Sequence, residues 1–304
     1  MADAGIITPI TRCRTLSRIA CSALVMGAYG ALPVWKEHSI YHDIGDTPTQ
    51  IHAALTLVLG WLLVFRTNTA YSRWWEARTL WGGLVNACRN LAAKLSLLVR
   101  LPAGELQEVQ RLMVAFPYAL RDHLRNIALL QKLPGFEADE RPVEHIPGFL
   151  VEQMYAKLRQ WKAAGLIDGD ELRVIDEELR RFLDICGGCE RIQKTRLARS
   201  YRVFARQCVC LFLGTFPWGI VNDFGWWTIP ITAITAYFML GLEVVAEHVE
   251  EPFGFDEDDL DLDGLCETIS RTAGETFRRQ IALTATASPV EASALREAPV
   301  FGQP

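Results

Sequence analysis

The sequence predicts an all-α integral membrane protein. Half of the 304 residues are hydrophobic although 22% are charged, which is typical of a chain divided between lipid and water. Four apolar segments carry no formal charge, and no strand-like alternation of polar and apolar residues persists anywhere. The alternative interpretation is a soluble all-α protein in which the same four segments are buried helices.

The four uncharged segments are the expected membrane helices. They are Ile19–Trp35, Ile51–Phe65, Gln207–Asn222 and Phe224–Leu242. A helix needs about 20 apolar residues to span a bilayer, with about 17 as the lower limit. The first and last segments are long enough alone, whereas the second and third need their flanks or protein neighbours. Tryptophans lie within or near the segment ends, as interfacial anchors often do: Trp35, Trp61, Trp218, Trp226 and Trp227.

The region between the second and third segments is expected to be helical. Residues 66–99 have helical periodicity without proline, and Pro102 suits the first turn of the next helix. Residues 134–148 are typical of a loop, and the amphipathic helix that follows should end at Gly165. Asp168 and Glu171 resemble a capping box at the start of another helix. From about residue 283, a tail rich in Ala, Ser, Thr and Pro is expected to be disordered or to wrap a partner.

Lysines and arginines set the expected orientation. They gather before the first segment, after the second and before the third: Arg12, Arg14, Arg18, Arg66, Arg73, Arg78, Lys194, Arg196, Arg199, Arg202 and Arg206. The positive-inside rule therefore places both termini and the middle region in the cytoplasm. We expect a multi-pass protein of a cell membrane, with the bacterial inner membrane favoured. We expect five parts along the chain. Residues 1–65 hold the N-terminal segment and the first two membrane helices, 66–206 the cytosolic helical region, and 207–246 the third and fourth membrane helices. Residues 247–282 hold the acidic segment and a C-terminal helix, and 283–304 a flexible tail.

Composition and motifs exclude several other classes. The net charge of −5 argues against a nucleic-acid binder, which would show a basic surplus. Gly-rich phosphate loops, G-x-S-x-G and H-E-x-x-H are missing from the sequence. Among eight cysteines, Cys186 and Cys189 form a CxxC pair, but no second pair lies at zinc-ribbon spacing. Small buried side chains in helix contacts are therefore favoured over a zinc site.

One apolar stripe runs through the second segment. Leu57, Trp61 and Phe65 recur every four residues and so lie near one face of one helix. Such a stripe is usually core or lipid-facing packing. If identical helices from several subunits converged, the stripe would instead line a narrow hydrophobic passage, which gates by excluding water. The pattern leaves both interpretations open, and the helix would emerge into the cytosol at Arg66.

Several motifs resemble those of the bestrophin family of ion channels. They are FRTNTAYSRWWEARTLWG (65–82), EEPFGFDEDDLDLDGLC (250–266) and, in the form of the bacterial and plastid branch, GGCERIQKT (187–195) and GWWTIPITAITAYFMLGLEVVAEHVE (225–250). The likeness covers about residues 10–275 in the expected order and spacing. It implies a homopentamer around one central pore, with four membrane helices and a helical cytosolic part in each subunit.

The resemblance also implies two constrictions along the pore. A narrow hydrophobic neck corresponds to Leu57, Trp61 and Phe65, and a cytosolic constriction corresponds to Leu197. A five-fold ring of Trp61 would be unusually tight, and Ala198 stands where relatives usually have proline. No catalytic residue and no required cofactor is expected. The expected partners are the chain's own copies, membrane lipid and small inorganic ions.

The acidic segment after the last apolar segment is a candidate calcium site. Asp256, Asp258 and Asp259 offer hard oxygen ligands, of which calcium takes six to eight, but their spacing is not that of an EF-hand. The resemblance assigns calcium to Asp256 and Asp259, completed by backbone carbonyls near His248 and Glu251. A solvated acidic loop is the alternative, because prokaryotic members often keep these acids without evident calcium control.

Residues beside the inner constriction bear on the sign of the conducted ion. Arg196 and Arg199 flank Leu197, and five copies of each would favour anions unless they face lipid headgroups or pair with acids. The electropositive edges of aromatic rings in the neck act in the same direction. We therefore expect chloride-like anion conduction, with a sodium-conducting channel of the same fold as the alternative.

Two alternatives belong to other classes of protein. One is a non-conducting membrane scaffold whose cytosolic helices bind partners. The other is a membrane-embedded metalloenzyme, for which the candidate ligands are Glu243, Glu247, His248 and Glu250. The ExxH pairs of a di-iron bundle are missing from the sequence, which disfavours this enzyme.

Overall fold

A computed structural model of the chain describes residues 14–40 and 48–286. Within these ranges the chain is all-helical, and none of the described residues lies in a strand. The expected fold class is confirmed in this respect. The expected tail falls largely outside the described residues, although the last helix runs as far as Thr286.

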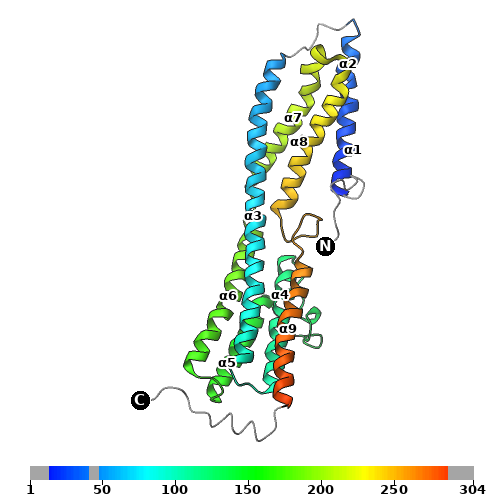
Figure 1. Cartoon of the computed structure of the whole chain (residues 1–304). Coiled ribbons are helices and arrows are strands. Elements are labelled where there is room, and N and C mark those ends of the chain that lie inside the picture. Colours follow the sequence, from blue (N-terminus) through cyan, green and yellow to red (C-terminus); the bar gives the residue numbers. More distant parts are fainter. Residues whose placement is uncertain (1–13, 41–47, 287–304) are drawn as a thin grey trace. The chain divides into compact units, whose positions relative to one another are not determined.

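Nine α-helices and two short 3-10 helices follow one another through the described ranges (Figure 1). The α-helices are α1 (Arg14–Tyr29), α2 (Ala31–Glu37), α3 (Thr49–Leu97), α4 (Ala103–Leu124), α5 (Ile146–Ala163), α6 (Gly169–Lys194), α7 (Arg199–Phe224), α8 (Thr228–Glu250) and α9 (Leu262–Thr286). The short helices are η2 (Leu130–Lys132) and η3 (Gly225–Trp227).

Within residues 14–40 and 48–286, three helical stretches are long and apolar enough to cross a membrane. They are Thr15–Glu37, Thr49–Leu97 and Arg199–Glu250. The last of these contains α7 and α8, and so contains both the third and the fourth expected segment. Gly225 joins the two helices with a φ of 50°, a backbone conformation that favours glycine. The count of four membrane crossings stays a prediction.

The chain divides into two compact units. Among the described residues, unit 1 comprises 14–40, 48–76 and 195–260, and unit 2 comprises 77–194 and 261–286. Helix α3 contributes to both, as expected from the helical periodicity that continues past Arg66 without a break. The long region between the second and third apolar segments is therefore helical from its first residue.

In unit 1, α1, α7 and α8 pack with the first part of α3 (Figure 1). Gly27 of α1 allows a close approach to α8, because a Cβ at this position would lie 2.9 Å from Cβ of Ala233. The apolar core shared by the four helices consists of Ala23, Leu59, Leu63, Val209, Phe212, Leu213 and Ala236. Burial of this core fixes which face of α3 turns inward.

The first expected membrane segment is not one continuous helix. It divides at Gly30 into α1 and α2. Pro33 lies one turn beyond the division, and its ring nitrogen cannot donate a helical hydrogen bond to the carbonyl of Tyr29. A missing donor of this kind explains why the helix is interrupted there.

In unit 2, α4 packs against α5, α6 and α9. Phe116 of α4 meets Phe182 of α6 edge to face, with ring centroids 4.7 Å apart. The buried carboxylate of Glu178 is paired with Lys94 of α3 at 2.8 Å, which satisfies a charge that would otherwise be costly in the core. Two aromatic rings and one ion pair thus hold α6 in place.

The helix ends in unit 2 agree closely with those predicted from the sequence. Oδ1 of Asp168 accepts the N–H of Glu171 at 2.7 Å, and Oε2 of Glu171 accepts the N–H of Asp168 at 2.8 Å, which is a reciprocal capping box. Gly165 follows α5 with a φ of 70°, as expected for a C-terminal glycine. Pro102 differs slightly, because it occupies the N-cap position rather than the first turn of α4.

Candidate functional site

The three residues of the apolar stripe on α3 are exposed in the single chain. Leu57 is 66% exposed, Trp61 62% and Phe65 57%, and the rings of Trp61 and Phe65 lie 6.0 Å apart. On the same helix Leu59 and Leu63 are buried against α7 and α8. The stripe therefore lies outside the chain's own core, where lipid or other copies of the chain can contact it.

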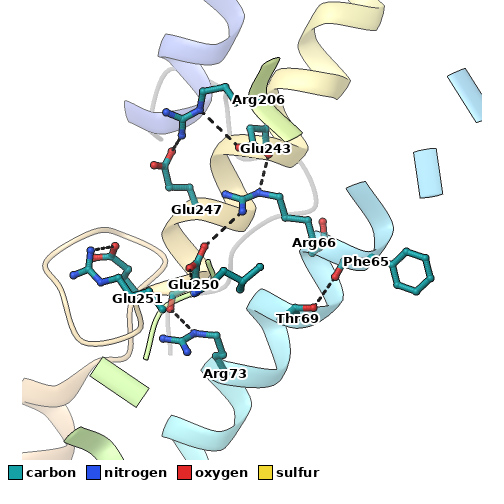
Figure 2. A network of polar contacts seen from close by, with 12 residues as sticks. Phe65, Arg66, Thr69, Arg73, Arg206, Glu243, Glu247, Glu250 and Glu251 are labelled. Atoms are coloured by element: carbon teal, nitrogen blue, oxygen red, sulfur yellow. Dashed lines mark hydrogen bonds and ion pairs between the residues drawn. The ribbon is translucent and has the colours of Figure 1, made fainter. Parts of the chain in front are cut away.

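Directly after the stripe, α3 presents a buried charge. The side chain of Arg66 is 1% exposed, and its Nε lies 2.8 Å from Oε2 of Glu243 while its Nη1 lies 3.7 Å from Oε2 of Glu250. Figure 2 shows Arg66 between these two carboxylates of α8, with Phe65 projecting away from them. Arg206 of α7 also approaches Glu243, at 3.8 Å. We call Arg66, Glu243 and Glu250 the buried charge network.

The network holds the short connection between α6 and α7. Oε1 of Glu250 accepts the backbone N–H of Leu197 at 3.0 Å. Arg73, about two turns further along α3, donates to the carbonyl of Glu250 at 3.2 Å and to the carbonyl of Thr195. Leu197, the expected constriction residue, is thus positioned by a carboxylate that also contacts the buried Arg66.

The two expected selectivity residues have different surroundings. Arg196 forms an ion pair with Glu251 at 2.5 Å, so its charge is partly compensated within the subunit. Arg199 is exposed at the start of α7 and has no ion pair among residues 14–40 and 48–286. It lines one groove together with Arg202 and Arg206. Of the two, Arg199 carries the less compensated charge.

The acidic segment is closed by its own hydrogen bonds. Oδ2 of Asp259 accepts the N–H of Asp256 at 2.6 Å, and Asp258 contacts Nδ1 of His248 at 3.3 Å. The carbonyl of His248 accepts the N–H of Glu251 at 3.1 Å. Several oxygens that calcium would use are therefore already hydrogen-bonded, although a carboxylate or carbonyl oxygen keeps a further lone pair.

Sequence reasoning did not foresee the buried charge network. Arg66 and Glu243 each follow an apolar segment by one residue, and ionisable residues at such positions usually pair with one another. That rule could have indicated the pair. It could not have chosen Glu243 and Glu250 over Glu247, because one helical face accommodates all three.

The comparisons with known proteins agree with the fold and the motifs. The chain matches the bacterial and fungal bestrophin protein family over residues 6–275. A voltage-dependent anion channel-forming protein of Mesorhizobium japonicum is 35% identical over 262 residues, which are 83% of this chain and 82% of that protein. A protein of the same description from Nostoc sp. is 33% identical over 225 residues, or 71% and 73%.

A solved structure shows the same fold. The crystal structure of a bacterial bestrophin homolog from Klebsiella pneumoniae matches with a TM-score of 0.81 at 23% identity. The match covers 86% of this chain and 99% of that one.

Proposed function

This chain belongs to the bacterial and fungal branch of the bestrophin family, and on that premise we propose that it is the subunit of a membrane channel that conducts small anions such as chloride. Support comes from relatives that are named voltage-dependent anion channel-forming proteins and are up to 35% identical. Family membership also indicates a channel rather than an enzyme. The inner membrane of a bacterium, with both termini in the cytoplasm, is the proposed location.

The observation that carries the proposal is the division of α3 into two faces. One face buries Arg66 against two carboxylates, and the other exposes the stripe of Leu57, Trp61 and Phe65. Such an anchored helix can present apolar side chains to a shared axis, where a ring of them forms a barrier to ions by excluding water. Reconstitution into planar bilayers, with reversal potentials measured in asymmetric potassium chloride, tests both conduction and ion sign.

A homopentamer is the first expected result. The resemblance implies five subunits, and the exposed stripe on α3 needs partners to form a passage. Native mass spectrometry of the protein in detergent should give a mass five times that of the 34.2 kDa chain. A stable monomer or dimer under conditions that preserve conduction would contradict both the pore and its neck.

Loss of arginine charge beside Leu197 is expected to weaken anion preference. Guanidinium groups stay charged, but only those within a Debye length of about 8 Å from the ion path act on it at physiological salt. We expect Arg196→Ala with Arg199→Ala to move the reversal potential toward the cation equilibrium value, more strongly at low salt. Arg199→Ala alone should give most of the shift, because Arg196 is already paired with Glu251.

The matched control for this prediction removes two exposed arginines from unit 2. Arg159→Ala with Arg180→Ala makes the same change in net charge away from the α6–α7 connection. Equal shifts in the two double variants would indicate a general surface effect. A reversal potential that stays constant at low ionic strength in the Arg196 and Arg199 variant would show that these arginines lie away from the ion path.

Three alternatives remain distinguishable by experiment. A sodium-conducting channel of the same fold would give the opposite reversal potential in asymmetric salt. A non-conducting scaffold would give no current. For a metalloenzyme, the candidate ligands Glu243 and Glu250 already contact Arg66, and Glu247 is paired with Arg206 at 2.8 Å, so these carboxylates are engaged with cations of the protein itself.

Calcium at Asp256 and Asp259 stays a prediction. The turn brings Asp259 against the backbone of Asp256, which places two acidic residues close together. The hydrogen bonds that already close the segment explain its shape without an ion. The proposed anion conduction does not depend on calcium.

A further inference from the structure

Unit 2 contains a cluster of metal-ligating side chains far from the α3 stripe in the sequence. It consists of His123 at the end of α4, His145 at the N-cap of α5, and Cys186 and Glu190 on α6. We call these four residues the α4–α6 cluster. Nε2 of His123 and Nε2 of His145 each lie 2.8 Å from Oε1 of Glu190. Sγ of Cys186 lies 3.9 Å from both Nε2 of His145 and Oε1 of Glu190.

The fold gathers these side chains from three helices. Cys186 and Glu190 are four residues apart on α6 and so share one face. The side-chain amide of Gln193 donates to the carbonyl of Leu124, which fixes the end of α4 beside α6. His145 is placed by its role at the start of α5, where its Nδ1 accepts the N–H of Gly148 at 2.9 Å.

We propose that the α4–α6 cluster binds a divalent first-row transition metal ion, with zinc as the preferred occupant. Two imidazoles, one thiolate and one carboxylate form the mixed nitrogen, sulfur and oxygen donor set that zinc accepts in tetrahedral sites. Nothing in the proposed channel function requires this site, so the two proposals stand or fall separately.

The donor separations lie on either side of those around a tetrahedral zinc ion. Bonds of about 2.0–2.3 Å from zinc to nitrogen, oxygen and sulfur place neighbouring donors roughly 3.3–3.7 Å apart. In the cluster the separations are 2.8 Å from each imidazole to the carboxylate oxygen, and 3.9 Å from Sγ of Cys186 to His145 and to Glu190. The nitrogen and oxygen donors all lie within 4.8 Å of one another. Binding would move the two imidazoles slightly away from the carboxylate oxygen and bring Sγ of Cys186 slightly closer to His145 and Glu190.

The surroundings and the exposure of two donors also bear on metal binding. The carboxylate of Glu190 is approached by both imidazoles at 2.8 Å and by Nζ of Lys194 at 3.2 Å. A bound metal ion displaces a thiol proton, as coordination does generally. The side chain of His145 is 46% exposed and gives an ion access.

A hydrogen-bonded cluster without metal is the alternative interpretation, and hydrogen exchange at the start of α5 separates the two. Hydrogen bonds explain why both imidazoles approach Glu190, but they give Cys186 only long contacts of 3.9 Å. Coordination by Nε2 of His145 would move its ring proton to Nδ1 and release the N–H of Gly148. Metal binding is therefore expected to increase hydrogen exchange at the start of α5.

Cobalt titration of the full-length protein in detergent tests the site. After treatment with a chelator, one Co²⁺ per chain should produce a thiolate-to-cobalt charge-transfer band and the visible bands of tetrahedral cobalt, and Zn²⁺ should displace it. Cys186→Ser should remove the charge-transfer band. Cys186→Ser and His123→Gln should each weaken Zn²⁺ binding by on the order of a hundredfold, because each removes one of four ligands.

Cys189→Ala is the matched control, because Cys189 is a buried cysteine on the same helix outside the cluster. This variant should keep the charge-transfer band and the affinity of the unchanged protein. A band that persists in Cys186→Ser, or an equal Zn²⁺ affinity in His123→Gln and the unchanged protein, would overturn the proposal. If either variant folds poorly, His145→Gln in the same titration decides the question, since this side chain is the most exposed of the four donors.

Discussion

Alanine in place of Trp61 or Phe65 is expected to raise the single-channel conductance several-fold. Both side chains are more than half exposed in the single chain and lie on the stripe that would face a shared axis. A hydrophobic ring blocks ions mainly because water does not fill it, so a wider ring of small side chains should stay wet. Trp61→Ala should have the larger effect, since five indoles would form the tightest ring. Single-channel recording in symmetric potassium chloride measures both variants.

Trp35→Ala serves as the control for these recordings. Trp35 lies on α2, is 71% exposed and belongs to no expected constriction. Its replacement should leave the conductance unchanged while removing a comparable aromatic surface. If the currents of the Trp61 and Phe65 variants equal those of Trp35→Ala, the neck is formed by other residues and the interpretation of the stripe is wrong.

Removal of Arg66 should destabilise the protein more than any other single change considered above. Arg66→Met leaves Glu243 and Glu250 buried without their cation, and loss of one partner of a buried ion pair costs about 3–5 kcal/mol. The midpoint of thermal unfolding in detergent should fall accordingly. Arg78→Met, on the same helix but exposed, should leave that midpoint nearly unchanged.

A triple variant separates lost charge balance from lost packing. Arg66→Met combined with Glu243→Gln and Glu250→Gln removes the uncompensated charges and should regain much of the stability. Glu250→Leu alone should loosen the α6–α7 connection, because leucine has no oxygen to accept the N–H of Leu197. An Arg66→Met protein as stable as Arg78→Met would show that the buried charge network contributes little to stability.

Local patterns predicted the helices well, because their causes lie within one or two turns. The capping box of Asp168 and Glu171 and the stop at Gly165 both depend on residues at most a few positions away. The division of the first apolar segment at Gly30 was missed although it has a local cause in Pro33. That segment was predicted to be one helix because of its apolar composition and length, and the effect of Pro33 on the helix was not considered.

The sequence alone determined the helical class, the apolar segments, the continuity of α3 through Arg66 and the motifs that identify the family. Each of these depends on residue type and short-range spacing. Only the tertiary structure decided which carboxylates meet Arg66, that Glu250 holds Leu197, and that His145 and His123 converge on Glu190. Glu190 lies 67 positions from His123 and 45 from His145 in the sequence, and Glu250 lies 53 positions from Leu197. Helix packing brings such residues together, and it depends on many weak apolar contacts between distant parts of the chain. Short-range sequence patterns therefore cannot predict which residues will meet.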